Sequence, residues 1–487
     1  MEGLDVPQRP EEREAYFMKE VSAGEAVCAQ GEKGYEQAAK HFYHALKVYP
    51  NPIELVLIYQ RTIPEQLFTI IMAMMAQEVK IKKEKYYEVF PPSDMNVYVK
   101  DFNAKNKTSA AEGKKKKKDT KEEEPTQEVE EVKKGAFLFA GKDFKQGDVI
   151  YTEECVVSSL LPGVDAASFC AGCATVLVTK EQVAIEDKVK EVEKEEVSEE
   201  TLEKDGEKIE EVQETEAVIK GEKLQQLKKD QEKYDNQTQC PVCKEVFYCS
   251  SKCRDEHYPQ IHQYVCTGGE SSDESRPEKK FAQLLSSNNT IIPYLVGMFF
   301  GTLLDIETTK EKSLAMGVST PTNKLSYLST GNKSLDFTVW EHLERLSSSE
   351  KSSDSASDAE ALSLINALFG SKIAGLSEFV NLERYVMIKE KLAANCFAFS
   401  TNLAESSDSE KSETSVAKIC DSFKSLESSG SSANAVALYI VSSYISSASE
   451  AKVPSNVDFK FLDGNTKLSL VAKSDISKDD QLFVGIV

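Results

Sequence analysis

The sequence predicts a multidomain α+β protein, in which an all-helical N-terminal domain precedes a β-rich domain with an inserted metal-binding segment. Three observations predict this fold class. Apolar side chains recur at helical spacing in the first hundred residues, apolar and polar residues alternate near residues 135–153 and 456–487, and runs of like charge separate these parts. The 487-residue chain has room for about three domains.

The N-terminal domain, residues 10–100, is expected to be helical throughout. Residues 38–48 have helical spacing, and the prolines at 50 and 52 end that helix because proline cannot continue it. Residues 64–79 form another predicted helix. Between the two, residues 53–62 place four side chains at positions i, i+3, i+4 and i+7 of one helical face: Leu55, Ile58, Tyr59 and Thr62.

Two segments are dominated by charge. Residues 101–134 are predicted to be a disordered linker, and residues 180–233 a charged insert, because blocks of like charge cannot bury apolar surface. The run Lys114–Lys118 leaves a nuclear signal as an alternative to a solvated linker.

Charge and hydropathy exclude several classes of protein. The formal net charge of −22 argues against general nucleic-acid binding and favours basic partners. The most apolar run, residues 290–304, contains Pro and Gly and is shorter than the roughly 20 residues of a membrane-spanning helix, so it is expected to be a buried helix. The acidic N-terminus resembles neither a secretory signal nor a transit peptide. No transmembrane segment is predicted in this chain.

The β-rich domain spans residues 135–487. Its first strands are predicted around Phe139 and residues 149–151, joined by a Lys-Gln-Gly-Asp turn, and its last strands lie within residues 456–487.

Closely paired cysteines predict zinc in this domain. CxxC spacing allows two thiolates to reach one ion, and the chain offers enough ligands for two closed four-ligand sites, which are structural rather than catalytic. An odd total of 11 cysteines favours metal over disulfides, in a reducing compartment. His257 is the alternative to His262. The candidate ligands are Cys170, Cys173, Cys240, Cys243, Cys249, Cys253, His262 and Cys266.

The order CxxC…CxxC…YCSxxC…HxxxC resembles the MYND zinc finger, here over residues 170–266. The ligands of that family alternate. The resemblance therefore implies one site from the knuckle at 170–173 with Cys249 and Cys253, and a second from the knuckle at 240–243 with His262 and Cys266. It also implies peptide partners. The family has a short loop where this chain has the 66 residues 174–239, and a flexible insert of that kind costs little loop-closure entropy.

The sequence around this finger resembles SET–MYND lysine methyltransferases. GAFLFAGKDFKQGDVIYTE at 135–153, NCFAFST at 395–401 and the segment 467–487 are similar to SET strands. Three elements of that family are altered. Phe137 replaces the second glycine of Gly-x-Gly, Ser446–Ser449 stands where Asn-His-Ser-Cys is expected, and Ile486 replaces the terminal tyrosine. These changes predict a SET-like scaffold that does not bind S-adenosylmethionine. An S-adenosylmethionine-dependent protein-lysine methyltransferase is the alternative.

The segments AYFMKEVSAGEAVCAQG, AAKHFYHALKVYPNP and ELVLIYQRTIPEQLF closely resemble the twenty-kilodalton presequence receptors of the mitochondrial outer-membrane translocase. That resemblance implies a tetratricopeptide-like helical fold. It also implies a hydrophobic groove for the apolar face of a basic amphipathic presequence. Matching segments assign the groove to Phe17, Met18, Val21, Val48, Leu55, Ile58, Tyr59 and Thr62. For the stripe in residues 53–62, burial in the core is the competing interpretation.

Together, these patterns predict an import receptor-like domain fused to a zinc-binding SET–MYND module without catalysis. The partners implied are mitochondrial precursor proteins, translocase subunits and peptides bound by the finger. The location implied is the cytosolic face of the mitochondrial outer membrane, and a cytoplasmic location is the alternative because this chain contains no predicted span. A zinc-dependent scaffold with neither activity is a third hypothesis.

Overall fold

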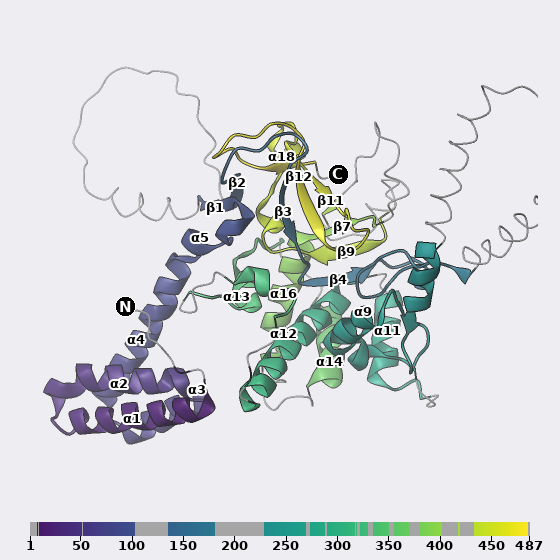
Figure 1. The fold of residues 1–487 in the computed structure, drawn as a ribbon. Helices are drawn as coiled ribbons and strands as arrows, with labels where there is room; N and C mark the ends of the chain where they lie inside the picture. Colours follow the sequence, from purple (N-terminus) through teal and green to yellow (C-terminus); the bar gives the residue numbers. More distant parts are fainter. Residues whose placement is uncertain are drawn as a thin grey trace, which may run out of the picture. The chain divides into compact units, whose positions relative to one another are not determined.

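The computed structural model has mixed helix and sheet (Figure 1). It describes residues 7, 9–50, 52–102, 135–180, 228–268, 273–287, 290–316, 318, 322–329, 335–349, 355–370, 379–401, 417–418 and 433–485. The chain divides into two compact units. Unit 1 contains Met1–Lys142 and Asp305–Glu341, and unit 2 contains Asp143–Leu304 and His342–Val487.

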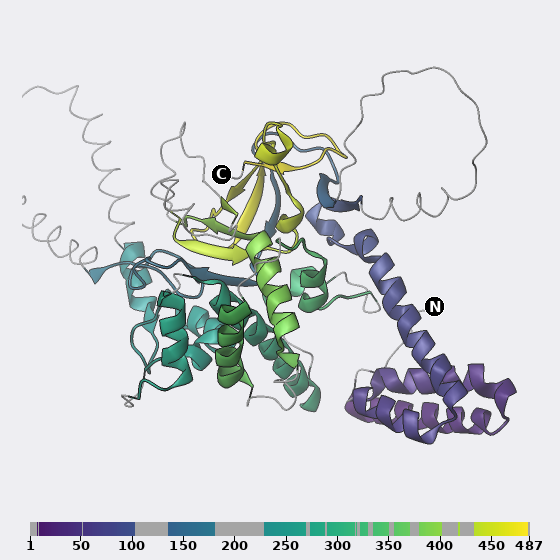
Figure 2. The ribbon, with the colours of Figure 1, turned by 180° about the vertical axis from the view of Figure 1, so that it is seen from behind.

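Unit 1 begins with helices that lie side by side, and the long α4 extends beyond them (Figures 1 and 2). Eight buried residues of the second, third and fourth helices form a core: Ala38, Ala39, Phe42, Leu46, Leu55, Tyr59, Leu67 and Ile71. Gly34 is required at the start of α2, since a Cβ there would lie 2.4 Å from the Val27 carbonyl oxygen. The helices are α1 (Pro10–Cys28), α2 (Tyr35–Val48), α3 (Pro52–Thr62), α4 (Glu65–Glu84) and α5 (Tyr86–Val89).

The expectation that the first hundred residues are entirely helical is wrong at their end. Strand β1 (Val97–Asp101) pairs antiparallel with β2 (Ala136–Ala140), with Val97 opposite Ala140. Residues 103–134, most of the predicted linker, lie outside the described residues. Their two flanks are therefore adjacent strands of one ribbon rather than the ends of two separate domains.

Residues 305–341 also pack within unit 1. The Phe337 ring lies edge-on to Tyr86, with ring centroids 4.8 Å apart, and the Lys82 ammonium lies 5.0 Å from the Phe337 centroid. This stretch follows the apolar run at 290–304 in the sequence, and no sequence pattern predicted its position.

Unit 2 is built around two sheets, whose strands lie on one side of α11, α14 and α16 (Figures 1 and 2). One sheet has the strand order β10-β13-β11-β12-β3, and the other has the order β4-β9-β7-β8. Central strands β7, β9 and β12 are buried along their whole length, as expected of strands covered on both faces. The strands are β3 (Val149–Glu153), β4 (Val157–Leu160), β7 (Cys396–Phe399), β8 (Ala417–Lys418), β9 (Ala435–Leu438), β10 (Ser446–Ser447), β11 (Val457–Lys460), β12 (Leu468–Ala472) and β13 (Phe483–Val484).

The apolar run at 290–304 begins α12 (Ile292–Ala315), and Leu295–Val296 and Met298–Phe300 are buried. In the part of the chain that the structure describes, no helix is both long and apolar enough to cross a bilayer. The other described α-helices outside residues 170–266 are α11 (Pro277–Ser287), α13 (Val339–Arg345), α14 (Ser355–Phe369), α16 (Leu382–Asn395) and α18 (Ala448–Ala451).

The metal-binding segment consists of short elements. Two-residue strands β5 (Thr238–Gln239) and β6 (Phe247–Tyr248) pair antiparallel. They are followed by α9 (Ser251–His257), a π-helical turn (Tyr258–His262) and α10 (Gln263–Val265).

Candidate functional site

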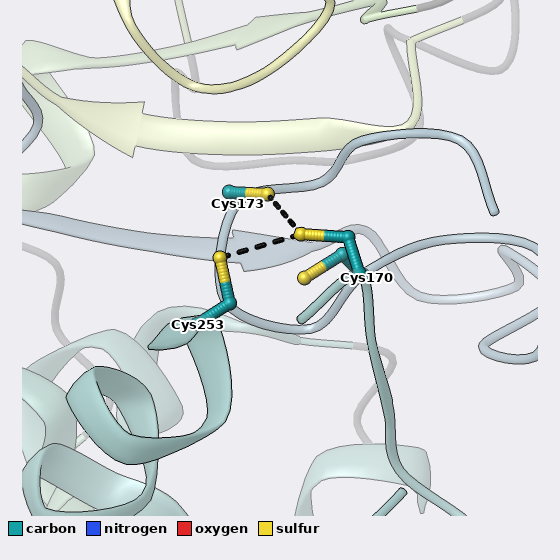
Figure 3. Close-up of side chains that lie close together, drawn as sticks. Cys170, Cys173 and Cys253 are labelled. Atoms are coloured by element: carbon teal, nitrogen blue, oxygen red, sulfur yellow. Dashed lines mark hydrogen bonds between the residues drawn. The ribbon is translucent and has the colours of Figure 1, made fainter. Parts of the chain in front are cut away.

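Four cysteines from separate parts of the sequence converge at site 1, which we define as Cys170, Cys173, Cys249 and Cys253. Their sulfur atoms all lie within 4.8 Å of one another. The Sγ atoms of Cys173 and Cys249 are 3.6 Å apart, and those of Cys249 and Cys253 are 3.4 Å apart. Figure 3 shows the sulfur atoms of Cys170, Cys173 and Cys253 turned toward one another.

Site 2, which we define as Cys240, Cys243, His262 and Cys266, is a second group whose ligand atoms lie within 4.8 Å of one another. The Sγ atoms of Cys240 and Cys266 are 3.9 Å apart, and Cys243 Sγ lies 3.5 Å from His262 Nε2. Burial lowers the pKa of His262, which favours the neutral imidazole that a metal requires.

These separations match a tetrahedral zinc ion. Zinc bonds of about 2.3 Å to sulfur and about 2.0 Å to nitrogen imply edges of about 3.8 Å between two sulfurs and about 3.5 Å between sulfur and nitrogen. The four distances given above, from 3.4 to 3.9 Å, lie close to those values. The donor set of thiolates and one imidazole is also the set that zinc prefers over harder cations.

Both knuckles use the same backbone turn. Ala174 and Lys244, the residues directly after each CxxC, have φ values of +58° and +57°. Their N–H groups donate to the carbonyl oxygens of Cys170 and Cys240, at 2.8 and 3.0 Å. A left-handed residue reverses the chain here and keeps the two thiols of each knuckle on the same side. For Cys253, the Ser250 hydroxyl accepts from its N–H at 3.2 Å and caps α9.

In unit 1, apolar side chains reach the surface of α1 and α3. Met18 is 57% exposed, Leu57 47% and Ile58 42%. Exposed acidic residues share these helices: Glu11, Glu12, Glu14, Glu25 and Glu54. Each of the two helices thus presents exposed apolar and exposed acidic side chains.

Comparison with known proteins separates the two regions. Residues 2–88 match the family model of the MAS20 protein import receptor, and residues 228–266 match that of the MYND finger. The N-terminal region is a MAS20-type domain. A stretch of 95 residues is 40% identical to the mitochondrial import receptor subunit TOM20 of Saccharomyces cerevisiae and covers 20% of this chain and 45% of that protein. Over 76 residues the chain is 38% identical to the tom20 subunit of Neurospora crassa, covering 16% of this chain and 41% of the relative. This chain thus spans less than half the length of either relative.

The MYND finger match explains only part of the metal geometry. It begins at residue 228, so the knuckle at 170–173 lies outside it, yet the structure brings that knuckle to Cys249 and Cys253. The eight predicted ligands form the two quartets that the resemblance implied. His257 belongs to neither quartet, and its Nδ1 lies 3.3 Å from the Tyr248 hydroxyl. Most of the charged insert, residues 181–227, lies outside the described residues.

The predicted groove residues fall into two groups according to how far they are buried in the MAS20-type domain. Met18, Ile58 and Thr62 are exposed, and Phe17 and Val21 are half-buried. Leu57, which the prediction omitted because it lies off the helical stripe that periodicity selects, is exposed as well.

The other three residues do not present a free surface. Val48, Leu55 and Tyr59 are only 3–4% exposed, and Leu55 and Tyr59 belong to the core. The assignment of these three to an open groove is therefore corrected. Leu55 and Tyr59 turn inward from α3 and pack against core residues of α2 and α4, and Val48 is buried at the last turn of α2.

The structure describes two of the three positions at which the sequence departs from the SET resemblance. Gly135 has a φ of +126°, and a Cβ there would lie 3.0 Å from the Phe137 ring, so this ring fills the space beside the glycine. The hydroxyls of Ser447 and Ser449 lie 2.9 Å apart. Ile486 lies outside the described residues.

Proposed function

We propose that the MAS20-type domain binds the presequences of mitochondrial precursor proteins. The observation that supports this most directly is the exposure of Met18, Leu57 and Ile58 on helices that also carry exposed glutamates. A presequence forms an amphipathic helix, so its apolar face would cover these side chains while its basic face meets the glutamates. Attraction between opposite charges would speed association and make it sensitive to salt.

The test is a titration of a fluorescent presequence peptide against the full chain. Leu57→Asp should weaken the Kd about tenfold, because the substitution removes about 1 kcal/mol of apolar burial and adds the cost of a charge at the interface. Leu462→Asp is the matched control, since Leu462 is 53% exposed but lies in unit 2. Equal affinities for the wild type and both variants would contradict the proposal.

This domain would act at the cytosolic face of the mitochondrial outer membrane, together with other translocase subunits. The support for this location is the name of the two relatives, which are mitochondrial import receptor subunits. Cell fractionation should place the chain with mitochondria, in a form that added protease digests without membrane rupture. Recovery in the cytosol alone would contradict this part of the proposal.

For the second region we propose two structural zinc ions, one in each quartet. The ion of site 1 would cross-link the knuckle at 170–173 to Cys249 and Cys253, which lie much later in the sequence, and the ion of site 2 would join two ends of one short segment. Both would supply local folding free energy. Elemental analysis of the full chain should find two zinc ions. Cys173→Ser and Cys243→Ser should each reduce the count to one. A wild-type count below two would contradict this proposal.

We further propose that the second region is a SET-like scaffold without methyl transfer, whose finger binds peptide partners. The support is the Phe137 ring beside Gly135 and the serines at 446, 447 and 449. Calorimetry with S-adenosylmethionine should show no binding. A micromolar Kd would favour the protein-lysine methyltransferase instead.

A further inference from the structure

Site 1 is held by residues that lie far outside the finger. The Thr401 hydroxyl donates to the Ala174 carbonyl oxygen at 2.6 Å, and the Thr466 backbone N–H donates to the Cys173 carbonyl oxygen at 3.0 Å. Both acceptors lie at the end of the first knuckle. Thr401 follows β7 and Thr466 precedes β12, so both sheets of unit 2 contact this turn.

The Thr401 hydroxyl is itself fixed in orientation. It accepts from Asn434 Nδ2 at 2.9 Å, while the Thr401 N–H donates to Asn434 Oδ1 at 2.9 Å. Thr401 is only 2% exposed, so this bond does not compete with water. Because its oxygen accepts from Asn434, its single proton is available for the Ala174 carbonyl.

The acceptor of this hydrogen bond, the Ala174 carbonyl oxygen, belongs to the residue of the knuckle with an unfavourable backbone conformation. Ala174 has a φ of +58°, which costs a residue with a Cβ about 1 kcal/mol or more and persists only when the surroundings enforce it. The turn that places Cys170 and Cys173 together depends on this conformation. The described contacts of site 2 include no corresponding bond from either sheet to Lys244.

We propose that Thr401 is a positioning residue for site 1: its hydroxyl locks the left-handed turn at Ala174 and thereby presents Cys170 and Cys173 to the metal. This inference rests on the proposed zinc binding. It extends site 1 to a residue that is 148 positions in sequence from Cys253, the nearest ligand of that site. Residues that orient a metal ligand through a hydrogen bond commonly change metal affinity 10- to 100-fold, roughly, when they are replaced.

The experiment measures zinc release from each site separately, in the full chain. Cys243→Ser retains only site 1, and Cys173→Ser retains only site 2. Each protein is first checked for one zinc ion per chain. Release to an excess of a chromogenic zinc chelator is then followed with and without Thr401→Val, which keeps the shape of the side chain but removes the hydroxyl.

Thr401→Val should accelerate release about tenfold in the Cys243→Ser background and leave release in the Cys173→Ser background unchanged. Thr401→Ser keeps the hydroxyl and should restore slow release. Thr302→Val is the matched control, because Thr302 is equally buried and its hydroxyl makes no hydrogen bond to any described residue. Unchanged release from site 1, or equal acceleration at both sites, would overturn the inference.

A second measurement serves if Thr401→Val does not fold. Hydrogen exchange should speed up at the Thr466 N–H, the donor to Cys173, when site 1 is removed by Cys173→Ser but not when site 2 is removed by Cys243→Ser. The same exchange rate in both variants would overturn the inference. A wild-type protein with fewer than two zinc ions is a different result, which contradicts the proposed zinc binding itself.

Discussion

The Lys82 ammonium lies 3.0 Å from the Glu341 carboxylate, although 259 residues separate them in the sequence. The pair lies next to the edge-on contact of Tyr86 with Phe337. The end of α4 and the start of α5, both within the MAS20-type match, are thus completed by a segment from much later in the chain. Unit 1 is discontinuous, since it is built from two segments that are far apart in the sequence.

Removing the Phe337 ring should therefore destabilise unit 1. Phe337 is buried, so Phe337→Ala should lower the free energy of unfolding by about 3 kcal/mol. The chain has a single tryptophan, Trp340, three residues away, whose fluorescence during urea unfolding reports this region. Met316→Ala, which removes a largely exposed side chain of unit 1, should leave the midpoint unchanged. Equal midpoints for both variants would show that the Phe337 contact contributes nothing.

Two glutamates should make unit 1 sensitive to acid. Burial alone would raise the pKa of Glu78, but hydrogen bonds from Lys47 and Tyr43 outweigh it and lower that pKa. For Glu341, burial is outweighed by the Thr338 backbone N–H and by Lys82, so its pKa is also lowered.

Because both folded-state pKa values are depressed, their stabilisation is fully present above the ordinary value of 4.5 and is lost as the pH falls from there through the folded-state values. The urea midpoint of Trp340 fluorescence should fall over that range, and Glu78→Gln with Glu341→Gln should flatten the fall. Replacing the exposed Glu36 and Glu65 is the control. If the pH profile of the double variant overlays that of the wild type, Glu78 and Glu341 are not the cause of the loss of stability in acid.

A single glycine should determine how α12 packs against site 2. A Cβ at Gly301 would lie 1.5 Å from the Gln260 carbonyl oxygen, in the π-helical turn that carries His262. Gly301→Ala should displace this turn and lower the zinc count from two to one. At Gly297 a Cβ would make only an ordinary 3.5 Å contact with Ile261, so Gly297→Ala should be neutral or slightly stabilising. Two zinc ions in Gly301→Ala would show that the finger tolerates this displacement.

Neighbouring positions in α3 should respond differently to truncation. Leu55 is buried in the core, so Leu55→Ala should cost about 2–5 kcal/mol of stability. Ile58 is exposed, so Ile58→Ala should change stability by less than about 0.5 kcal/mol but weaken presequence binding. Urea unfolding and peptide titration of the same two proteins separate these effects. A large stability loss in Ile58→Ala would place that side chain in the core instead.

The sequence by itself determined the features that depend on local spacing. Prolines 50 and 52 and the helical repeat placed α2, α3 and α4 within a few residues, since these signals act over one or two turns. The CxxC spacing at 170–173 and 240–243 indicated zinc for the same reason. Periodicity could not separate the buried Leu55 and Tyr59 from the exposed Ile58, because it identifies a helical face but not the depth of burial along it.

Only the tertiary structure decided which distant groups meet. Three such contacts are not indicated by any local sequence pattern. They are the pairing of β1 with β2 across residues 103–134, the contact of Lys82 with Glu341, and the hydrogen bond from Thr401 to Ala174. Each contact forms only when the complete fold brings two distant segments together. The sequence around a single threonine or glutamate does not show whether that residue has such a partner. Local spacing thus predicted the candidate metal ligands, and long-range packing determined which distant residues contact them.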